Sequence, residues 1–129
     1  MHTDKNESIE SAITEKIIGC AYTVSNTLGA GFLEKVYENA LAIEFNKNSI
    51  QFKQQAPIKV MYRDIIVGEF VSDLIVESTV LVELKASKAI DDAHVAQCLN
   101  YLKATNIRFG LIINFGKPKV EIKRVVLGF

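Results

Sequence analysis

The sequence predicts an α/β domain in which helices flank a central mixed sheet of four to five strands. Three observations lead to this prediction: apolar residues recur with helical spacing over the first third of the chain, three β-type segments follow one another, and one helical segment then separates two apolar strands. Adjacent strands followed by a crossover helix and further strands are typical of a layered α/β domain. We expect one domain over residues 8–129, preceded by a disordered terminus over residues 1–7.

Two helices are expected at the start of this domain. The first runs from Ile9 to Leu28, and its apolar stripe consists of Ile9, Ile13, Ile17, Cys20, Val24 and Leu28. Gly29 and Gly31 then permit the backbone angles of a sharp corner. The second helix runs from about Phe32 to Asn46, and its expected inward residues are Leu33, Val36, Tyr37, Ala40 and Leu41.

The rest of the chain predicts five strands and one more helix. The expected strands are residues 51–62, 65–76, 79–86, 107–115 and 119–127. Asp91 or Asp92 opens a helix that extends to about Ala104, because aspartate is a good helix N-cap. The strands at 79–86 and 107–115 are apolar on both faces, as expected for a central parallel pair that helices cover.

Composition narrows the class of protein. Fifteen basic and fifteen acidic residues give a formal net charge of zero, which counts mildly against a dedicated nucleic-acid binder but is compatible with a local basic cleft. Charges interrupt every apolar run before the roughly 20 residues that a membrane span requires, and the polar start does not resemble a secretory signal. Cys20 and Cys98 would permit one disulfide, but we favour buried free thiols in a reducing compartment and therefore expect a cytoplasmic protein.

Two acidic residues stand out in the β-type segments. If a three-residue loop at 77–79 joins the strands as a hairpin, Val76 opposes Val80 and Asp73 opposes Glu83, with Cβ atoms roughly 4.5–5.5 Å apart. Lys85 shares the face of Glu83, because side chains alternate along a strand. A structural alternative places Asp73 at an exposed bulge and treats Glu83 and Lys85 as an ordinary ion pair. We favour a functional role for these three residues over this structural alternative, because charges on a covered face of an apolar strand are costly to bury.

An all-oxygen pair of carboxylates beside a lysine suits a hard cation such as Mg²⁺ or Mn²⁺. Asp73 and Glu83 would hold the ion, with the backbone carbonyl of Leu84 as an extra ligand. Lys85 would orient a water molecule or stabilise charge that develops on a phosphate. Glu34 would act as an additional ligand or behind the ligands, although it would also stabilise the start of its helix without any such role.

Other kinds of site find less support. His94 and Cys98 have the spacing of a helical metal pair, but no further Cys or His completes a zinc site. The Gly29–Gly31 corner lacks the features of a phosphate-binding loop. Gln97 and Tyr101 share one face of the third helix, where a polar boundary is the simplest interpretation of their spacing.

Five segments together resemble those of the PD-(D/E)XK nuclease superfamily, which has the restriction-endonuclease-like fold, and more closely the small GxxExxY proteins assigned to it. The segments are Gly31–Tyr37, Ser72–Val76, Val82–Ala86, Gln97–Leu102 and Ile113–Gly116, and the resemblance extends over about residues 13–127. It implies a mixed sheet of four or five strands between helices, which agrees with the order of elements above.

The resemblance also implies roles for individual residues. Glu34, Asp73 and Glu83 take the acidic metal positions, and Lys85 takes the catalytic lysine position. Gln97 and Tyr101 take the helical Gln-x-x-x-Tyr positions. Two departures are Ser72, which stands where the superfamily's name has a proline, and Val24-Ser25, which stands where related sequences often read Val-His.

The expected function is therefore hydrolysis of phosphodiester bonds in DNA or RNA by a metal-dependent nuclease. Lys88, Lys103 and Arg108 are candidate phosphate contacts, and a homodimer or a partner protein would complete the grip of so small a domain on its substrate. One alternative is a non-catalytic module that binds nucleic acid or protein through the same cleft. Another is a folded remnant in which the charges form structural ion pairs only.

Overall fold

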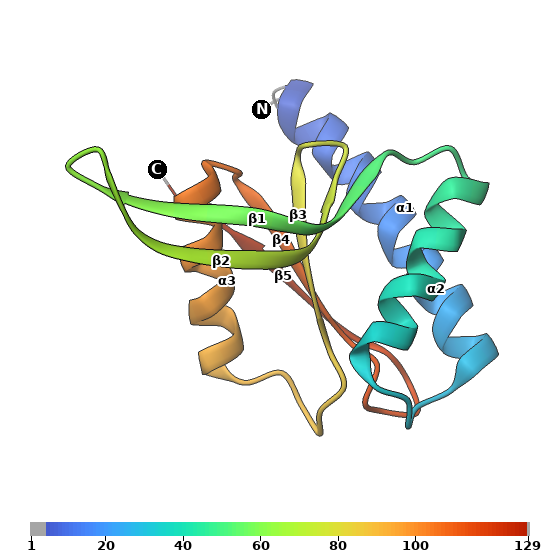
Figure 1. The fold of residues 1–129 in the computed structure, drawn as a ribbon. Helices are drawn as coiled ribbons and strands as arrows, with labels where there is room; N and C mark the ends of the chain where they lie inside the picture. The colour runs from blue at the N-terminus through green and yellow to red at the C-terminus, as the bar shows by residue number, and fades with distance from the viewer. Residues whose placement is uncertain (1–4, 129) are drawn as a thin grey trace.

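A five-stranded mixed sheet forms the centre of the computed structural model, which describes residues 5–128 (Figure 1). The elements are, in chain order, α1 (Lys5–Leu28), α2 (Glu34–Lys47), β1 (Phe52–Tyr62), β2 (Ile65–Val76), β3 (Val80–Lys85), α3 (Asp92–Thr105), β4 (Phe109–Asn114) and β5 (Glu121–Val126). This order is the predicted one, so the α/β class with a mixed sheet flanked by helices is confirmed.

The strands lie side by side in the order of their numbering. β3 and β4 run parallel, with Val80 opposite Phe109, and the other neighbouring strands are antiparallel. α3 makes the crossover that a parallel pair requires. The predicted parallel pair of strands is therefore confirmed.

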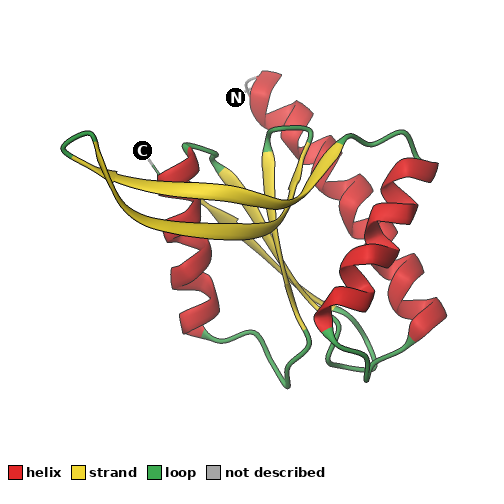
Figure 2. Cartoon of the chain, in the orientation of Figure 1, coloured by secondary structure: helices red, strands yellow, loops and turns green. Residues whose placement is uncertain are grey.

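The sheet separates two layers of helices, with α1 and α2 on one face and α3 on the other (Figure 2). Val82 and Leu84 of β3 are buried in the larger core beneath α1 and α2, whereas Leu81 packs with Cys98 and Leu102 of α3. Since side chains alternate along a strand, Glu83 and Lys85 face α3 together with Leu81. Cys20 and Cys98 are both buried free thiols, in agreement with the favoured interpretation.

The start of the chain differs from the prediction. Residues 1–4 of the terminus expected to be disordered lie outside the described residues, and α1 begins at Lys5, four residues before the predicted helix start at Ile9. Ile9 at this end is 56% exposed, although the stripe placed it inside. The helix extends past the edge of the core, and its apolar periodicity therefore continues beyond the packed part. None of the helices in residues 5–128 is long and apolar enough to cross a membrane.

The buried face of α2 agrees with the prediction at Tyr37 and Leu41 but differs from it elsewhere. Leu33 and Val36 are exposed, and the buried residues are Tyr37, Glu38, Leu41, Ala42 and Phe45. The predicted face assumed that a charged residue points outward. Glu38 instead points inward and is only 3% exposed, because polar partners from another element meet it there.

The β1–β2 hairpin is longer than the rest of the sheet and extends past α3 (Figure 1). Arg63 and Asp64 form its tip with φ angles of 50° and 64°, the left-handed conformation of a tight two-residue hairpin turn. Large apolar side chains remain exposed on this arm, among them Met61, Ile65 and Phe70.

Candidate functional site

The register of β2 and β3 brings the two predicted acids together. Val76 pairs with Val80 and Leu74 with Val82, so the next opposed pair is Asp73 and Glu83. Here side chains take over from the backbone ladder: the Asp73 N–H donates to Glu83 Oε2 at 3.0 Å, and the Leu84 N–H donates to Asp73 Oδ2 at 2.7 Å. The predicted hairpin register is confirmed.

Ser72 gives Glu83 a second hydrogen bond. This serine is fully buried, and its hydroxyl donates to Glu83 Oε2 at 3.1 Å. A proline at position 72 would lack that donor. The departure from the superfamily's proline therefore adds a group that orients the Glu83 carboxylate.

The pair carries uncompensated negative charge. Burial, and next the charge of Asp73, raises the pKa of Glu83 to about 7. Burial also raises the pKa of Asp73, to which the carboxylates of Glu38 and Glu34 contribute. The charge of Lys85 lowers the pKa of both acids, but by less than burial raises it. The ionised forms of the two acids are therefore disfavoured where they lie, and a bound cation would stabilise them.

The donor atoms of the pair suit a hard cation. Within residues 5–128 the hydrogen bonds to the two carboxylates all end on Glu83 Oε2 and Asp73 Oδ2. One oxygen of each acid is therefore left for another ligand. Two carboxylate oxygens with excess negative charge match the preference of Mg²⁺ and Mn²⁺ for oxygen ligands.

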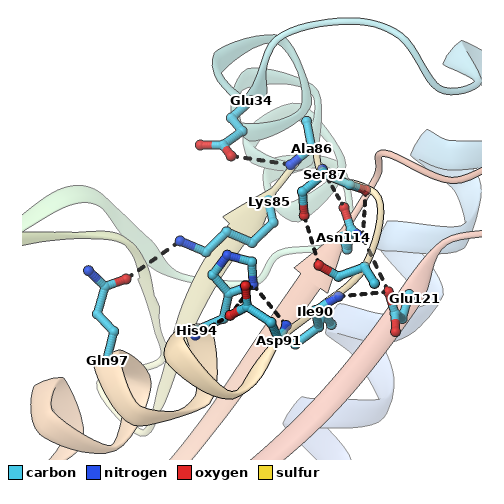
Figure 3. Close-up of polar contacts among 11 residues, drawn as sticks. Glu34, Lys85, Ala86, Ser87, Ile90, Asp91, His94, Gln97, Asn114 and Glu121 are labelled. Atoms are coloured by element: carbon cyan, nitrogen blue, oxygen red, sulfur yellow. Dashed lines mark hydrogen bonds and ion pairs between the residues drawn. The ribbon is translucent and has the colours of Figure 1, made fainter.

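Lys85 follows on the same strand and reaches α3. Its Nζ donates to Gln97 Oε1 at 3.5 Å (Figure 3). Tyr101 lies one turn further along α3 and is 9% exposed. Burial and then the charges of Glu83 and Asp73 raise the pKa of Tyr101. The structure thus brings Gln97 and Tyr101 to the site.

Glu34 lies at the edge of the candidate site, just past the end of β3. It is the first residue of α2, and its Oε2 accepts a hydrogen bond from the Ala86 N–H at 3.2 Å, just past the end of β3 (Figure 3). Among the described residues, no three His, Cys, Asp or Glu side chains lie together as a group that could hold a metal ion. The expected set of three carboxylates is therefore not assembled, and the pair Asp73 and Glu83 remains.

The loop that begins α2 explains two further positions of the Gly31–Tyr37 segment. Gly31 has a φ of 117°, which favours glycine. The Tyr37 hydroxyl donates to the Gly29 carbonyl at 2.6 Å and accepts from the Phe32 N–H at 3.2 Å. Its ring stacks on Phe115 with centroids 4.5 Å apart. Gly31 and Tyr37 thereby shape the corner that presents Glu34.

The segment after β3 is fixed by Asn114, which is fully buried at the end of β4. Its amide side chain accepts from the Ser87 N–H and donates to the Ser87 carbonyl, both at 3.0 Å (Figure 3). Gly116 lies so close that a Cβ there would overlap Ser87 O. These contacts hold the backbone just beyond Lys85.

Asp91 and Cys98, at the start of α3 and within it, have structural roles. Asp91 is the N-cap of the helix, and its carboxylate accepts from the His94 N–H while His94 Nδ1 accepts from the Asp91 N–H. The prediction that an aspartate opens this helix is confirmed. Burial, and next the charge of Glu83, raises the pKa of the Cys98 thiol to about 12, so this cysteine stays protonated.

Sequence reasoning missed the buried Glu38. Its carboxylate accepts from Gln54 Nε2 at 2.6 Å and Gln55 Nε2 at 2.7 Å, and it pairs with Lys35 at 3.1 Å. Gln55 has a φ of 51° although it is not glycine, and it lies between the strand pairs Gln54–Leu74 and Ala56–Ser72. The available signal was its spacing of four residues from Glu34 on one helix, which places both acids on the same side.

Comparison with known proteins identifies the family. A model of the PD-(D/E)XK nuclease superfamily matches residues 11–125, and the chain belongs to this superfamily. No curated protein matches the chain.

Two solved structures share the fold. The crystal structure of SSO0001 is 15% identical, with a TM-score of 0.55, and the match covers 97% of this chain and 62% of that one. An alkaline exonuclease (LHK-Exo) from Laribacter hongkongensis is 12% identical, with a TM-score of 0.56, and the match covers 99% of this chain and 73% of that one. This chain therefore spans less than two thirds of the SSO0001 chain.

Proposed function

We propose that this protein is a divalent-metal-dependent nuclease that hydrolyses phosphodiester bonds in DNA or RNA. The observation that carries the proposal is the pairing of Asp73 with Glu83 directly beside Lys85, at the end of β3 where the backbone ladder to β2 stops. Membership of a nuclease superfamily and the fold shared with an alkaline exonuclease support it.

Asp73 and Glu83 would hold Mg²⁺ or Mn²⁺ with their remaining carboxylate oxygens, and the Leu84 carbonyl would be a further ligand. When bound, the ion would polarise the phosphodiester and supply an activated water. Glu34, held on the Ala86 N–H, would act from outside the ligand set by adding negative charge at the rim.

Lys85 would stabilise negative charge on the phosphate as the bond breaks. Gln97 is its positioning residue, since its amide oxygen holds the lysine Nζ. Tyr101 would line the approach to the acidic pair. Its raised pKa keeps the hydroxyl protonated, so it remains a hydrogen-bond donor at neutral pH.

We further assign the chain to the GxxExxY group within the superfamily. The support is that Gly31 and Tyr37 build the corner and Glu34 follows from it, so the three named positions form one structural unit. A cytoplasmic location is proposed from the two free buried thiols.

The proposal is tested by cleavage of labelled single-stranded, duplex and branched DNA and RNA in EDTA, Mg²⁺ or Mn²⁺. We expect cleavage only with a metal ion, and a loss of roughly a hundred-fold or more in Glu83→Ala and Lys85→Ala. Glu69→Ala and Lys123→Ala, which remove exposed charges elsewhere, are the matched controls. Cleavage that persists in Glu83→Ala and Lys85→Ala would show a contaminant and overturn the proposal.

A non-catalytic binding module is the second candidate. It is favoured by the net charge of zero and because, among residues 5–128, no three His, Cys, Asp or Glu side chains form a group that could hold a metal ion. Binding of nucleic acid or protein without cleavage over the whole panel of substrates would select this alternative.

A further inference from the structure

An open groove lies between the β1–β2 arm and α3. It has a volume of about 830 Å³, which lies in the range of roughly 300–1,000 Å³ typical of ligand sites. Val60, Met61 and Phe70 line it from the arm, and Gln97, Tyr101 and Lys103 line it from the helix. The remaining wall consists mainly of small α3 residues.

The groove shares Gln97 and Tyr101 with the candidate active site. Gln97, which holds Lys85 Nζ, belongs to its lining, and so does Tyr101, whose pKa responds to Glu83 and Asp73. A polymer whose phosphate lies at Lys85 would therefore place its neighbouring nucleotides in the groove.

The chemistry of this groove suits bases rather than phosphates. Phe70 is 48% exposed, and its ring lies 5.7 Å from that of Tyr101 at an angle of 39°. Lys103 alone carries a charge among the described residues that line the groove. A duplex turns its phosphates outward and hides its base faces, whereas an unpaired strand exposes base faces that stack on aromatic rings.

The position of Phe70 is built into the arm. Phe70 pairs with Ile58, whose side chain packs against Tyr101 and Leu102, so both face α3. Gly68 leaves room for the ring, because a Cβ there would lie 3.2 Å from Phe70 Cε2. The ring is thus directed to the groove although it is half exposed.

We propose that this groove binds the unpaired bases of a single-stranded polynucleotide, with Phe70 as the stacking surface. The inference rests on the proposed function, because it names the substrate class of the same site. Its binding energy comes from base faces and not from phosphate charge, which agrees with the net charge of zero.

Binding is measured in EDTA by fluorescence anisotropy with fluorescein-labelled oligothymidine, its RNA counterpart, an abasic strand of equal length and a duplex. We expect the wild type to bind single strands at least about ten-fold more tightly than the duplex or the abasic strand. Phe70→Ala and Phe70→Leu should each lose about ten-fold, since leucine restores apolar area but no ring. Tyr22→Ala, which removes a 40% exposed ring on α1, should bind like the wild type.

Equal binding of the duplex or the abasic strand, or full binding by Phe70→Ala, would overturn the groove proposal. So would a dimer by light scattering that Phe70→Ala abolishes while nucleic acid fails to bind, because a second copy would then occupy the groove. If cleavage depends on the metal ion but binding does not depend on Phe70, the nuclease proposal holds and the groove proposal is rejected. If binding depends on the Phe70 ring but no substrate is cleaved, the groove proposal holds and the nuclease proposal is rejected.

Discussion

Asp73 and Glu83 each bind the backbone of the other's strand. Glu83 accepts a hydrogen bond from the Asp73 N–H at 3.0 Å, and Asp73 accepts one from the Leu84 N–H at 2.7 Å. These bonds favour the ionised acids, yet burial outweighs them and raises both pKa values. The hydrogen bonds fix the positions of the two carboxylates, but ionising them in the folded protein costs free energy. Protonation or cation binding at the pair should therefore change the stability of the protein measurably.

Stability in EDTA should fall as pH rises from about 4.5 to about 7. The pKa of Glu83 is raised from 4.5 to about 7, so in this window the folded protein binds more protons than the unfolded chain. The contribution of Glu83 to stability is fully present below its pKa in the unfolded chain, about 4.5, and is lost as pH rises through its pKa in the folded protein, about 7. The loss is at most roughly 3 kcal/mol, at 1.36 kcal/mol per unit of pKa.

Urea unfolding at about pH 5 and about pH 8 measures this loss. Glu83→Gln cannot ionise, so its free energy of unfolding should change less between the two values. Glu69→Gln, at an exposed position on the arm, should keep the wild-type difference. An unaltered pH dependence in Glu83→Gln would assign the effect to other groups.

Mg²⁺ or Mn²⁺ should raise the melting temperature of the wild type. A ligand that binds only the folded state at a hundred times its Kd stabilises it by about 2.7 kcal/mol. The increase should be larger above pH 7 than at pH 5, because protonated carboxylates do not bind the ion. Thermal unfolding with and without the ion measures the change.

Asp73→Asn should lose most of this metal-dependent increase, whereas Glu69→Gln should retain it. If Asp73→Asn combined with Glu83→Gln still gained stability from the ion, the ion would bind elsewhere on the chain.

Local patterns were enough to predict the acidic pair. The alternation of side chains and the short turn at 77–79 fixed which residue opposes Asp73, and the apolar character of β3 indicated that its charges were unusual. Asp91 was predictable for the same reason, since a helix N-cap depends on adjacent residues.

Contacts between distant segments were not predictable in this way. Glu38 is buried because Gln54 and Gln55 of β1 donate hydrogen bonds to its carboxylate. The sequence of α2 alone does not predict these partners. The same holds for Glu34, whose partner is the Ala86 N–H beyond β3. A prediction from apolar periodicity assumes that every charged residue is exposed. It therefore placed Leu33 and Val36, which are exposed, on the inward face of α2.

Glu38→Ala should lower the free energy of unfolding by roughly 1–3 kcal/mol, because it removes the 3% exposed carboxylate that accepts hydrogen bonds from the amides of Gln54 and Gln55. Lys35→Ala removes only the partner whose side chain is 59% exposed, so its cost should stay below about 1 kcal/mol. Urea unfolding of both variants provides the comparison. Equal effects would mean that the ion pair, and not the amides of Gln54 and Gln55, holds Glu38.

Gly116→Ala should destabilise the protein by roughly 1–3 kcal/mol, the usual cost of overpacking. A Cβ at position 116 would overlap Ser87 O, which is backbone and cannot rotate away. Because Ser87 follows Lys85 closely, the same variant should also slow cleavage more than it weakens strand binding in EDTA. Gly19→Ala is the matched control, since nothing lies within 4 Å of a Cβ there and α1 should gain up to about 1 kcal/mol. Unfolding and cleavage measured side by side would contradict the close packing of this loop if both variants behaved alike.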